Sequence, residues 1–372
     1  MAKIKVTHLT FDMRIGGTEQ VIKNLVENTD PQQVEASILC IESPLGPFAD
    51  DLLNNGVEIT AFSRSPGFDH SLIKQIRNYI KRNKIDILHC HQYTPWVYGA
   101  LAAIATKTQV VFTEHGRFYP DSTTWKRKLI NPLLHKITAA TTAISNATKD
   151  ALTIYEYLPR EDIQVIYNGI APPVIDQHNI DQLRDELNIG KDTLCLGTIA
   201  RLDPIKNHPM MLNAFKGVLN SGIDAKLLII GDGEMRSTII GLIDELALTQ
   251  HVIMTGYIAK PHAHLALMDI YLLSSLSEGT SMTLLEAMSI EKPCVVTDAG
   301  GNPEIIANKV NGLVTKNDDA KAFADAIIEL ASDSGMRRSM GEASHQRFDK
   351  MFSVNAMTDL FLTLYHKVIT HK

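Results

Sequence analysis

Short apolar runs alternate with amphipathic stretches along almost the whole chain. Residues 4–9 are strand-like, residues 19–28 carry apolar side chains at helical spacing, and residues 36–41 form a second strand-like run. Such alternation is typical of parallel strands joined by helical crossovers. The pattern therefore predicts an α/β fold with open, doubly wound sheets.

The same alternation predicts further elements in both halves of the chain. In the first half we expect one more helix and four more strands, over residues 72–82 and over residues 85–90, 109–113, 138–145 and 165–167. In the second half we expect strands over residues 193–199, 227–230, 252–255, 270–276 and 293–298. Helices are expected there over residues 209–219, 282–290, 320–331, 336–348 and 354–370.

An interruption divides the two halves. The prolines Pro172 and Pro173 are followed by a polar stretch that extends to Gly190, after which the pattern resumes. A length of 372 residues is long for one core and suits two domains of about 150 to 200 residues. We therefore expect an N-terminal domain over residues 1–172, a C-terminal domain over residues 173–353 and a terminal helix over residues 354–372.

Composition narrows the class of protein. Hydrophobic residues make up 45% and charged residues 21% of the chain, as in ordinary globular proteins. The 36 Lys and Arg against 42 Asp and Glu give a net charge of −6, which argues against a nucleic-acid partner. No secretory signal is visible, and the longest apolar segment, residues 96–105, is about half of a spanning helix. We expect a cytoplasmic protein that is at most peripheral at the inner face of the cell membrane.

The cysteines and histidines do not predict a metal site. The four cysteines lie far apart in apolar runs, which is typical of buried free thiols in a reducing compartment. His89, Cys90 and His91 are one tempting group, but neighbouring side chains along a strand point to opposite faces. We therefore predict no metal.

A polar turn in the second half is the richest candidate for chemistry. It leads into a predicted helix whose first free amides belong to Met282, Thr283 and Leu284 and would favour an anion such as phosphate. Glu278 in the turn and Glu286 in the helix cannot serve that anion, but an ionised carboxylate accepts hydrogen bonds from sugar hydroxyls. The spacing fits a nucleotide-sugar site, and it also fits an ordinary αβ unit with two solvated or capping glutamates.

A second candidate lies in the turn after the strand predicted at residues 193–199. Arg201 and Lys206 are five positions apart across this turn, so both can reach one anion. Arginine supplies a planar fork and lysine a point charge, a combination that suits a diphosphate. On spacing alone, two surface cations are the simpler interpretation.

Loops after other predicted strands hold weaker candidates. Gly16 and Gly17 either let the chain turn into a helix or let backbone amides face a ligand at the carboxyl end of the sheet. His115, with Arg117 as a weaker neighbour, follows a buried strand at such an end, although a lone histidine is more often structural. Gly233 belongs to a Gly-x-Gly pair that lacks the third glycine of a dinucleotide fingerprint.

A basic segment, Trp125–Lys136, carries apolar residues at helical spacing. It is either a solvated helix face or a surface that meets anionic lipid or a lipid-linked acceptor. The overall acidity of the chain makes a local basic patch more notable.

These motifs together resemble the signature of retaining glycosyltransferases of family 4. The resemblance rests on the pair Glu278 and Glu286, on the downstream pair Gly300 and Gly301, and on the R-x4-K pair described above. It covers essentially the whole chain. It implies the GT-B fold, in which two doubly wound Rossmann-like domains face a cleft and the C-terminal helix crosses back to the first domain.

The resemblance also implies roles for the candidate residues. In the family the first glutamate contacts the donor sugar and the second binds the ribose hydroxyls, roles that fall here to Glu278 and Glu286. His115 would lie beside the donor sugar. The diphosphate and the rest of the donor would be bound by Arg201, Lys206, the backbone of Met282, Thr283 and Leu284, and by Gly16, Gly17, Gly233 and Tyr257.

The implied reaction moves a sugar from a nucleotide-diphosphate sugar to a hydroxyl of a saccharide or lipid-linked acceptor. The leaving diphosphate would deprotonate the acceptor on the same face, without a metal and without a cofactor besides the donor substrate. Surface polysaccharide or glycolipid biosynthesis is the implied setting. Another nucleotide-sugar enzyme of the same fold, such as an epimerase or a sugar-phosphate synthase, and an inactive binding protein remain as alternatives, and the motifs do not specify the donor base, the sugar or the acceptor.

Overall fold

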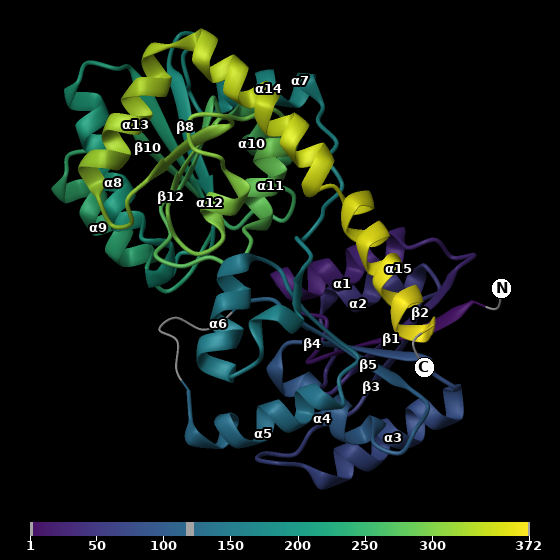
Figure 1. Ribbon diagram of the computed structural model, residues 1–372. Helices are drawn as coiled ribbons and strands as arrows, with labels where there is room; N and C mark the ends of the chain where they lie inside the picture. Colours follow the sequence, from purple (N-terminus) through teal and green to yellow (C-terminus); the bar gives the residue numbers. More distant parts are fainter. Residues whose placement is uncertain (1–2, 117–122, 371–372) are drawn as a thin grey trace. The chain divides into compact units, whose positions relative to one another are not determined.

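The computed structural model describes residues 3–116 and 123–370 (Figure 1). The chain divides into two compact units, each with its own parallel sheet. Unit 1 contains residues 1–170 and 352–372, and unit 2 contains residues 171–351. Arg117 lies outside the described residues.

Unit 1 is built on a seven-stranded parallel sheet with the order β3-β2-β1-β4-β5-β6-β7. Its strands are β1 (Ile4–Thr10), β2 (Val34–Cys40), β3 (Glu58–Ala61), β4 (Ile87–His91), β5 (Gln109–Glu114), β6 (Ala140–Ala143) and β7 (Ile163–Val165). The winding reverses between β1 and β4, which pair directly with His8 opposite His89. In doubly wound sheets, ligands bind at the carboxyl ends of the strands beside such a reversal.

Helices cover both faces of this sheet. They are α1 (Gly17–Asn28), α2 (Pro47–Asn54), α3 (His70–Asn83), α4 (Tyr93–Ala103), α5 (Trp125–Lys136), α6 (Asn146–Glu156) and the short 3₁₀ helix η1 (Arg160–Asp162). Apolar residues of α3 and α4 form one core with strand residues such as Leu9 and Leu88. Residues of α1 and α2 form a second core with Ile38 and Cys40.

The last helix, α15 (Val354–Thr370), follows unit 2 in the sequence but belongs to unit 1. It contacts α1, and the rings of Phe361 and Tyr365 pack against His89 of β4. Figure 1 shows this yellow helix beside α1 and the unit 1 sheet. The predicted return of the terminal helix to the first domain is confirmed.

Unit 2 is built on a six-stranded parallel sheet with the order β10-β9-β8-β11-β12-β13. Its strands are β8 (Leu194–Ile199), β9 (Ala225–Ile230), β10 (Val252–Gly256), β11 (Ile270–Leu273), β12 (Cys294–Thr297) and β13 (Gly312–Thr315). The winding reverses between β8 and β11. The predicted doubly wound architecture is therefore confirmed in both units.

The helices of unit 2 also lie on both sides of its sheet. They are α7 (Gln177–Glu186), η2 (Pro204–Lys206), α8 (His208–Asn220), α9 (Arg236–Glu245), α10 (His262–Leu267), α11 (Met282–Ser289), α12 (Asn302–Ile305), α13 (Ala320–Ser332) and α14 (Ser334–Met351). Figure 1 shows α8, α9 and α13 together on one side, and α10 and α11 on the other. The large core on the α8 side is lined by residues such as Phe215, Phe323 and Ile327.

Side-chain caps explain where several helices begin. Asp69 accepts from two amides at the start of α3, and Ser145 accepts from the amide of Thr148 in α6. Asp319 caps α13 in the same way. Each cap satisfies an amide that has no partner within its helix. Among the described helices, none is both long enough and apolar enough to cross a membrane.

Candidate functional site

The sequence candidates of the second half meet at one edge of the unit 2 sheet. Arg201 and Lys206 follow β8, and Glu278 follows β11, the strand paired with β8. Backbone hydrogen bonding joins the two loops, because the amide of Leu276 donates to the carbonyl of Ile205 at 2.7 Å. The sheet reverses its winding between these strands, so this edge is where an α/β sheet binds ligands.

Lys206 and Glu278 form an ion pair at this edge. Lys206 Nζ lies 2.5 Å from Glu278 Oε1, and Ser275 Oγ donates to the same oxygen at 2.6 Å. The side chain of Glu278 is 8% exposed and that of Lys206 is 21% exposed. A carboxylate with so little solvent needs a charged partner, so Lys206 compensates Glu278 while it stays accessible itself.

Arg201 is the most exposed of these candidates. Its side chain is 75% exposed, and its guanidinium Nε donates to Asp203 Oδ2 at 2.7 Å. Asp203 also accepts from the amide of Lys206 through its other oxygen and so caps η2. One carboxylate thus holds the loop that carries both cations.

The start of α11 offers fewer free amides than the sequence predicts. Ser281 caps the helix, and its Oγ accepts from the amide of Leu284 at 3.3 Å. The first intrahelical bond joins the amide of Leu285 to the carbonyl of Ser281. Of the three amides expected to bind an anion, that of Leu284 is therefore already bonded within the protein.

Glu286 lies one turn into α11 and has an altered acidity. Burial raises the pKa of its carboxyl to about 7. Hydroxyl groups that donate to the ionised carboxylate would offset the cost of burying its charge. The site therefore suits a ligand with neighbouring hydroxyls, as the ribose role requires.

Glycines hold the loops of this edge close together. Gly300 has a φ of +52°, and a Cβ there would overlap the carbonyl oxygen of Glu278. A Cβ at Gly233 would similarly approach the carbonyl of Leu202. The group that approaches Gly300 most closely is therefore the loop that carries Glu278.

Two further residues, Tyr257 and His208, lie at this edge. Tyr257, one of the donor-binding candidates, follows β10 and is 61% exposed. His208, at the start of α8, was not a sequence candidate. It is buried, neither ring nitrogen has a partner among the described residues, and burial lowers its pKa to about 4.

In unit 1 the predicted glycine pair opens α1. A Cβ on Gly16 would overlap the carboxylate of Glu19, whereas a Cβ on Gly17 would meet no described atom within 4 Å. Glu19, which sequence reasoning missed, has a pKa raised to about 7 by burial, with a smaller contribution from Asp12. Its only sequence signal is an acidic residue in a first helical turn, where helix electrostatics already explain it.

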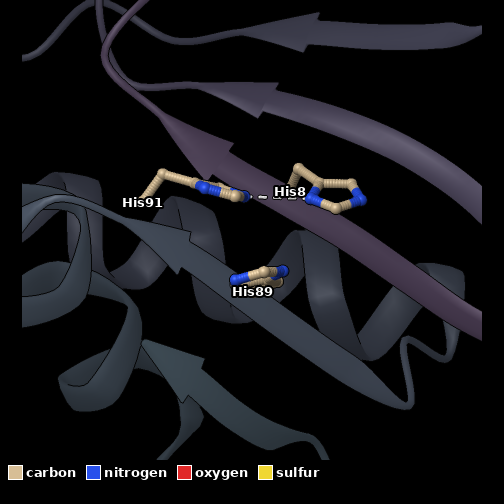
Figure 2. Close-up of side chains that lie close together, drawn as sticks. All are labelled: His8, His89 and His91. Carbon is tan, nitrogen blue, oxygen red and sulfur yellow. Dashed lines mark hydrogen bonds between the residues drawn. The ribbon is translucent and has the colours of Figure 1, made fainter. Parts of the chain in front are cut away.

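His115 is anchored by a second histidine. It follows β5, and its Nε2 lies 2.8 Å from Nδ1 of His91 at the end of β4. The other nitrogen of His91, Nε2, lies 3.0 Å from Nδ1 of His8 on β1. Figure 2 shows the contact between His8 and His91, with His89 beside them. No motif or spacing in the sequence indicates that His115 is connected to β1.

His89 and His91 lie close together, contrary to the expectation that the side chains of this group point to opposite faces. These residues are two apart on β4, so they share a face, and their ring centroids are 4.1 Å apart. With His8 they offer three nitrogens within 4.8 Å of one another. Two observations still disfavour a metal: the facing nitrogens of His8 and His91 are at hydrogen-bond distance, and both nitrogens of His89 are bonded, to the hydroxyls of Tyr365 and Thr113.

The basic segment forms α5 and presents an apolar stripe. Trp125, Leu129 and Leu133 recur every fourth residue and are 71%, 61% and 64% exposed. Lys126 and Lys128 beside them are also exposed. The opposite face of α5 carries buried residues, so the helix is anchored with this apolar and basic face outward.

Two family models match the chain, one in each half. Residues 15–172 match a model described as Glycosyltransferase Family 4. Residues 179–347 match a model described as Glycosyl transferases group 1.

Individual proteins are similar over most of the chain. N-acetyl-alpha-D-glucosaminyl L-malate synthase of Bacillus anthracis is 29% identical over 315 residues, which cover 82% of this chain and 80% of the relative. UDP-Gal:alpha-D-GlcNAc-diphosphoundecaprenol alpha-1,3-galactosyltransferase of Escherichia coli is 25% identical, covering 100% of this chain and 99% of the relative. The crystal structure of HepE from Anabaena in complex with UDP matches with a TM-score of 0.86 at 19% identity, covering 98% of this chain and 100% of that one.

Proposed function

The chain belongs to glycosyltransferase family 4 and has its GT-B fold, and from this premise we propose that it transfers a sugar, with retention, from a UDP-sugar to a hydroxyl acceptor. The choice of uridine is supported by the UDP bound to HepE and by the UDP-Gal in the name of the E. coli relative. The observation that carries the proposal is the grouping of two cations and two glutamates where the unit 2 sheet reverses.

We assign each part of the donor to a part of this edge. Lys206 and Arg201 bind the diphosphate, together with the backbone at the start of α11, Met282 to Leu284. Glu286 binds the ribose hydroxyls. Glu278 accepts a hydrogen bond from a sugar hydroxyl, because Lys206 and Ser275 both contact its Oε1 and leave acceptor capacity on the carboxylate. His115 of unit 1 hydrogen-bonds the sugar. Tyr257, Gly233, Gly16 and Gly17 contribute to donor binding.

The proposed chemistry relies on charge stabilisation. The bond between the anomeric carbon and the diphosphate oxygen breaks, and its electron pair leaves with the diphosphate. The acceptor oxygen bonds to the anomeric carbon from the same face, and its proton passes to the departing diphosphate. Lys206 and Arg201 stabilise the charge that grows on the leaving group, so we propose that no metal is needed. Transfer that persists in EDTA would support this point, and loss of transfer restored by Mg²⁺ would refute it.

Nucleotide binding tests the donor assignment directly. We expect UDP to raise the melting temperature more than GDP or ADP, because a ligand that binds the folded state stabilises it. Glu286→Ala should abolish the UDP effect, whereas Glu245→Ala, which removes an exposed carboxylate of α9, should preserve it. Equal stabilisation of both variants by UDP would reject the ribose role, and no stabilisation of the wild type would reject the donor.

We propose further that the acceptor is lipid-linked and that α5 meets an anionic membrane. The exposed stripe of Trp125, Leu129 and Leu133 between lysines is the pattern of an interfacial helix. The E. coli relative acts, by its name, on a diphosphoundecaprenol-linked sugar.

Vesicle binding tests this surface. We expect co-sedimentation with phosphatidylglycerol vesicles and little with phosphatidylcholine vesicles. Leu129→Ser should weaken it, and Val310→Ser, which changes an equally exposed residue (61%) of unit 2, should not. Equal binding by both variants would leave α5 as an ordinary solvated helix.

A further inference from the structure

Three histidines of unit 1 form a continuous hydrogen-bonded line. His8 Nδ1 lies 3.0 Å from His91 Nε2, and His91 Nδ1 lies 2.8 Å from His115 Nε2. The line therefore runs across three neighbouring strands or their ends, β1, β4 and β5. Figure 2 shows its inner contact, in which the rings of His8 and His91 point toward each other from adjacent strands.

The rings of this line stay neutral around pH 7. Burial lowers the pKa of His8 and of His115 to about 3, and it lowers the pKa of His91 well below its ordinary value. A neutral imidazole has one N–H, so one of its nitrogens donates and the other accepts. The line thus holds three ring protons for two internal hydrogen bonds.

Both bonds join an Nδ1 to an Nε2, and this restricts the arrangement of protons. If His91 donates from Nδ1, its Nε2 must accept, so His8 also donates from Nδ1, and His115 accepts at Nε2 and keeps its proton on Nδ1. If His91 donates from Nε2, all three protons sit on Nε2. Both bonds are satisfied only when the three rings share one tautomer.

We propose that the line holds one of these two shared tautomers, so that His91 and His8 act as positioning residues that decide whether Nδ1 of His115 donates or accepts. This nitrogen is buried and has no partner among the described residues, so it is the end of the line that a ligand can engage. The functional part of the inference rests on the proposed function, which places the donor sugar at His115. A sugar hydroxyl can accept or donate, and the line selects one of these for it.

A fourth histidine of this region, His89, provides an internal control. His89 is bonded to the hydroxyls of Tyr365 and Thr113, at 2.7 and 2.6 Å, and not to the line. Tyr365→Phe therefore removes a hydrogen bond from the same core without cutting the line. Any effect of lost packing or stability should appear in this variant as well.

Two substitutions of His91 distinguish the loss of its hydrogen bond to His115 from the loss of its imidazole ring. In His91→Asn the short amide can occupy the place of Nδ1 and keep the bond to His115. In His91→Gln the longer amide reaches toward the place of Nε2 and loses that bond. His8→Asn and His8→Gln form the same kind of pair for the bond between His8 and His91. They replace the His91 variants in the test if a His91 variant does not fold.

The test measures the ring ¹⁵N shifts of His115 in ligand-free protein, identified by their loss in His115→Asn. We expect one tautomer in the wild type and in Tyr365→Phe, and a mixture in His91→Gln. With a UDP-sugar, kcat should fall roughly tenfold in His91→Gln with KM changed less than about twofold, and His91→Asn should recover much of it. Unchanged shifts and kcat in His91→Gln, or equal losses in Tyr365→Phe, would overturn the proposal.

A metal would also overturn it. If Zn²⁺ alone raises the melting temperature of the wild type but not of His8→Asn, the ring nitrogens are ligands and not links in a line. The proposed function fails separately, because the ¹⁵N shifts need no substrate and UDP binding is measured at unit 2. If the tautomer of His115 depends on His91 but the protein does not bind UDP, the inference on the tautomer stands and its role in sugar transfer is rejected.

Discussion

At the scale of single residues, the Lys206–Glu278 pair couples the stability of unit 2 to its chemistry. Lys206→Met should lower the free energy of unfolding of unit 2 by about 1 to 3 kcal/mol, because it leaves a nearly buried carboxylate without a partner. Glu278→Gln added to Lys206→Met should restore much of that stability but not the transfer activity. Chemical denaturation and transfer assays on both variants check this, and a double variant as unstable as the single one would count against it.

Arg201 should behave in the opposite way. Its side chain is 75% exposed, so Arg201→Ala should change the free energy of unfolding by less than about 0.5 kcal/mol. If Arg201 binds the diphosphate, the same variant should weaken UDP binding roughly tenfold, the loss of one charge-assisted contact. Titration calorimetry measures this, and unchanged affinity would return Arg201 to the class of surface cations.

Glu286 makes the stability of unit 2 depend on pH. Burial raises its pKa from 4.5 to about 7, so between these values the unfolded chain has lost this proton while the folded chain retains it. The folded state therefore loses stability as pH rises through this window, by on the order of 2 kcal/mol. We expect Glu286→Gln to remove the loss, measured by denaturation at pH 5 and pH 8.

Glu19 is the matched control, because burial raises its pKa to about 7 in unit 1. Glu19→Gln should remove a similar loss from unit 1 and leave that of unit 2 unchanged. A pH dependence that survives in Glu286→Gln would mean that another group titrates in this window.

Sequence reasoning located Arg201, Lys206, Glu278 and Glu286 because their residue types and spacing are local features. It did not predict that Lys206 pairs with Glu278, 72 positions away. That pairing exists only because β8 and β11 are neighbours in the sheet, and strand order is not written in local periodicity. Glu19 was missed for a related reason, since its raised pKa comes from burial by the folded chain.

At the scale of elements, the loop after β12 depends on one glycine. Gly300→Ala should destabilise unit 2 by about 2 kcal/mol or more, because φ there is +52° and the added Cβ would overlap the Glu278 carbonyl. Gly241→Ala in α9 is the control: no described atom lies within 4 Å of its Cβ, so the change should stabilise by roughly 0.5 to 1 kcal/mol. Thermal denaturation of both variants checks the difference, and equal effects would contradict this account of the loop.

The elements that sequence reasoning found are those with strong periodicity. Most of the buried strands and α15, for example, lie where the apolar pattern predicts them, but the buried strand β13 was not predicted. The missed elements include β13, α2, α6, α9, α10 and α12, and two whose patterns are weak: β3 is an edge strand without a buried residue, and α7 is a polar helix in the stretch expected to be irregular. Helix α4 was seen as an apolar segment but not as a helix, because it is apolar on nearly all sides. In each case the sheet or its neighbours, and not local preference, decide the structure.

At the scale of the whole molecule, each unit has its own core, and the two family models also match separate halves. We expect two unfolding transitions in calorimetry, of which UDP should raise the one that belongs to unit 2. Phe361→Ala should lower the free energy of unfolding of unit 1 by about 3 kcal/mol, and so lower the temperature of the other transition. The reason is that this buried residue of α15 packs on the unit 1 sheet. A Phe361→Ala variant in which the UDP-sensitive transition moves instead would contradict the assignment of α15 to unit 1.

The position of α15 also sets an order of assembly on the ribosome. Unit 1 starts the chain, but residues 352–372 that complete it are made after the whole of unit 2. Unit 2 can finish folding before Phe361 and Tyr365 are available to cover the β1–β4 face of unit 1. The nascent first domain therefore displays an uncovered apolar and histidine-bearing surface for most of synthesis, and it is the natural client of a chaperone at that stage.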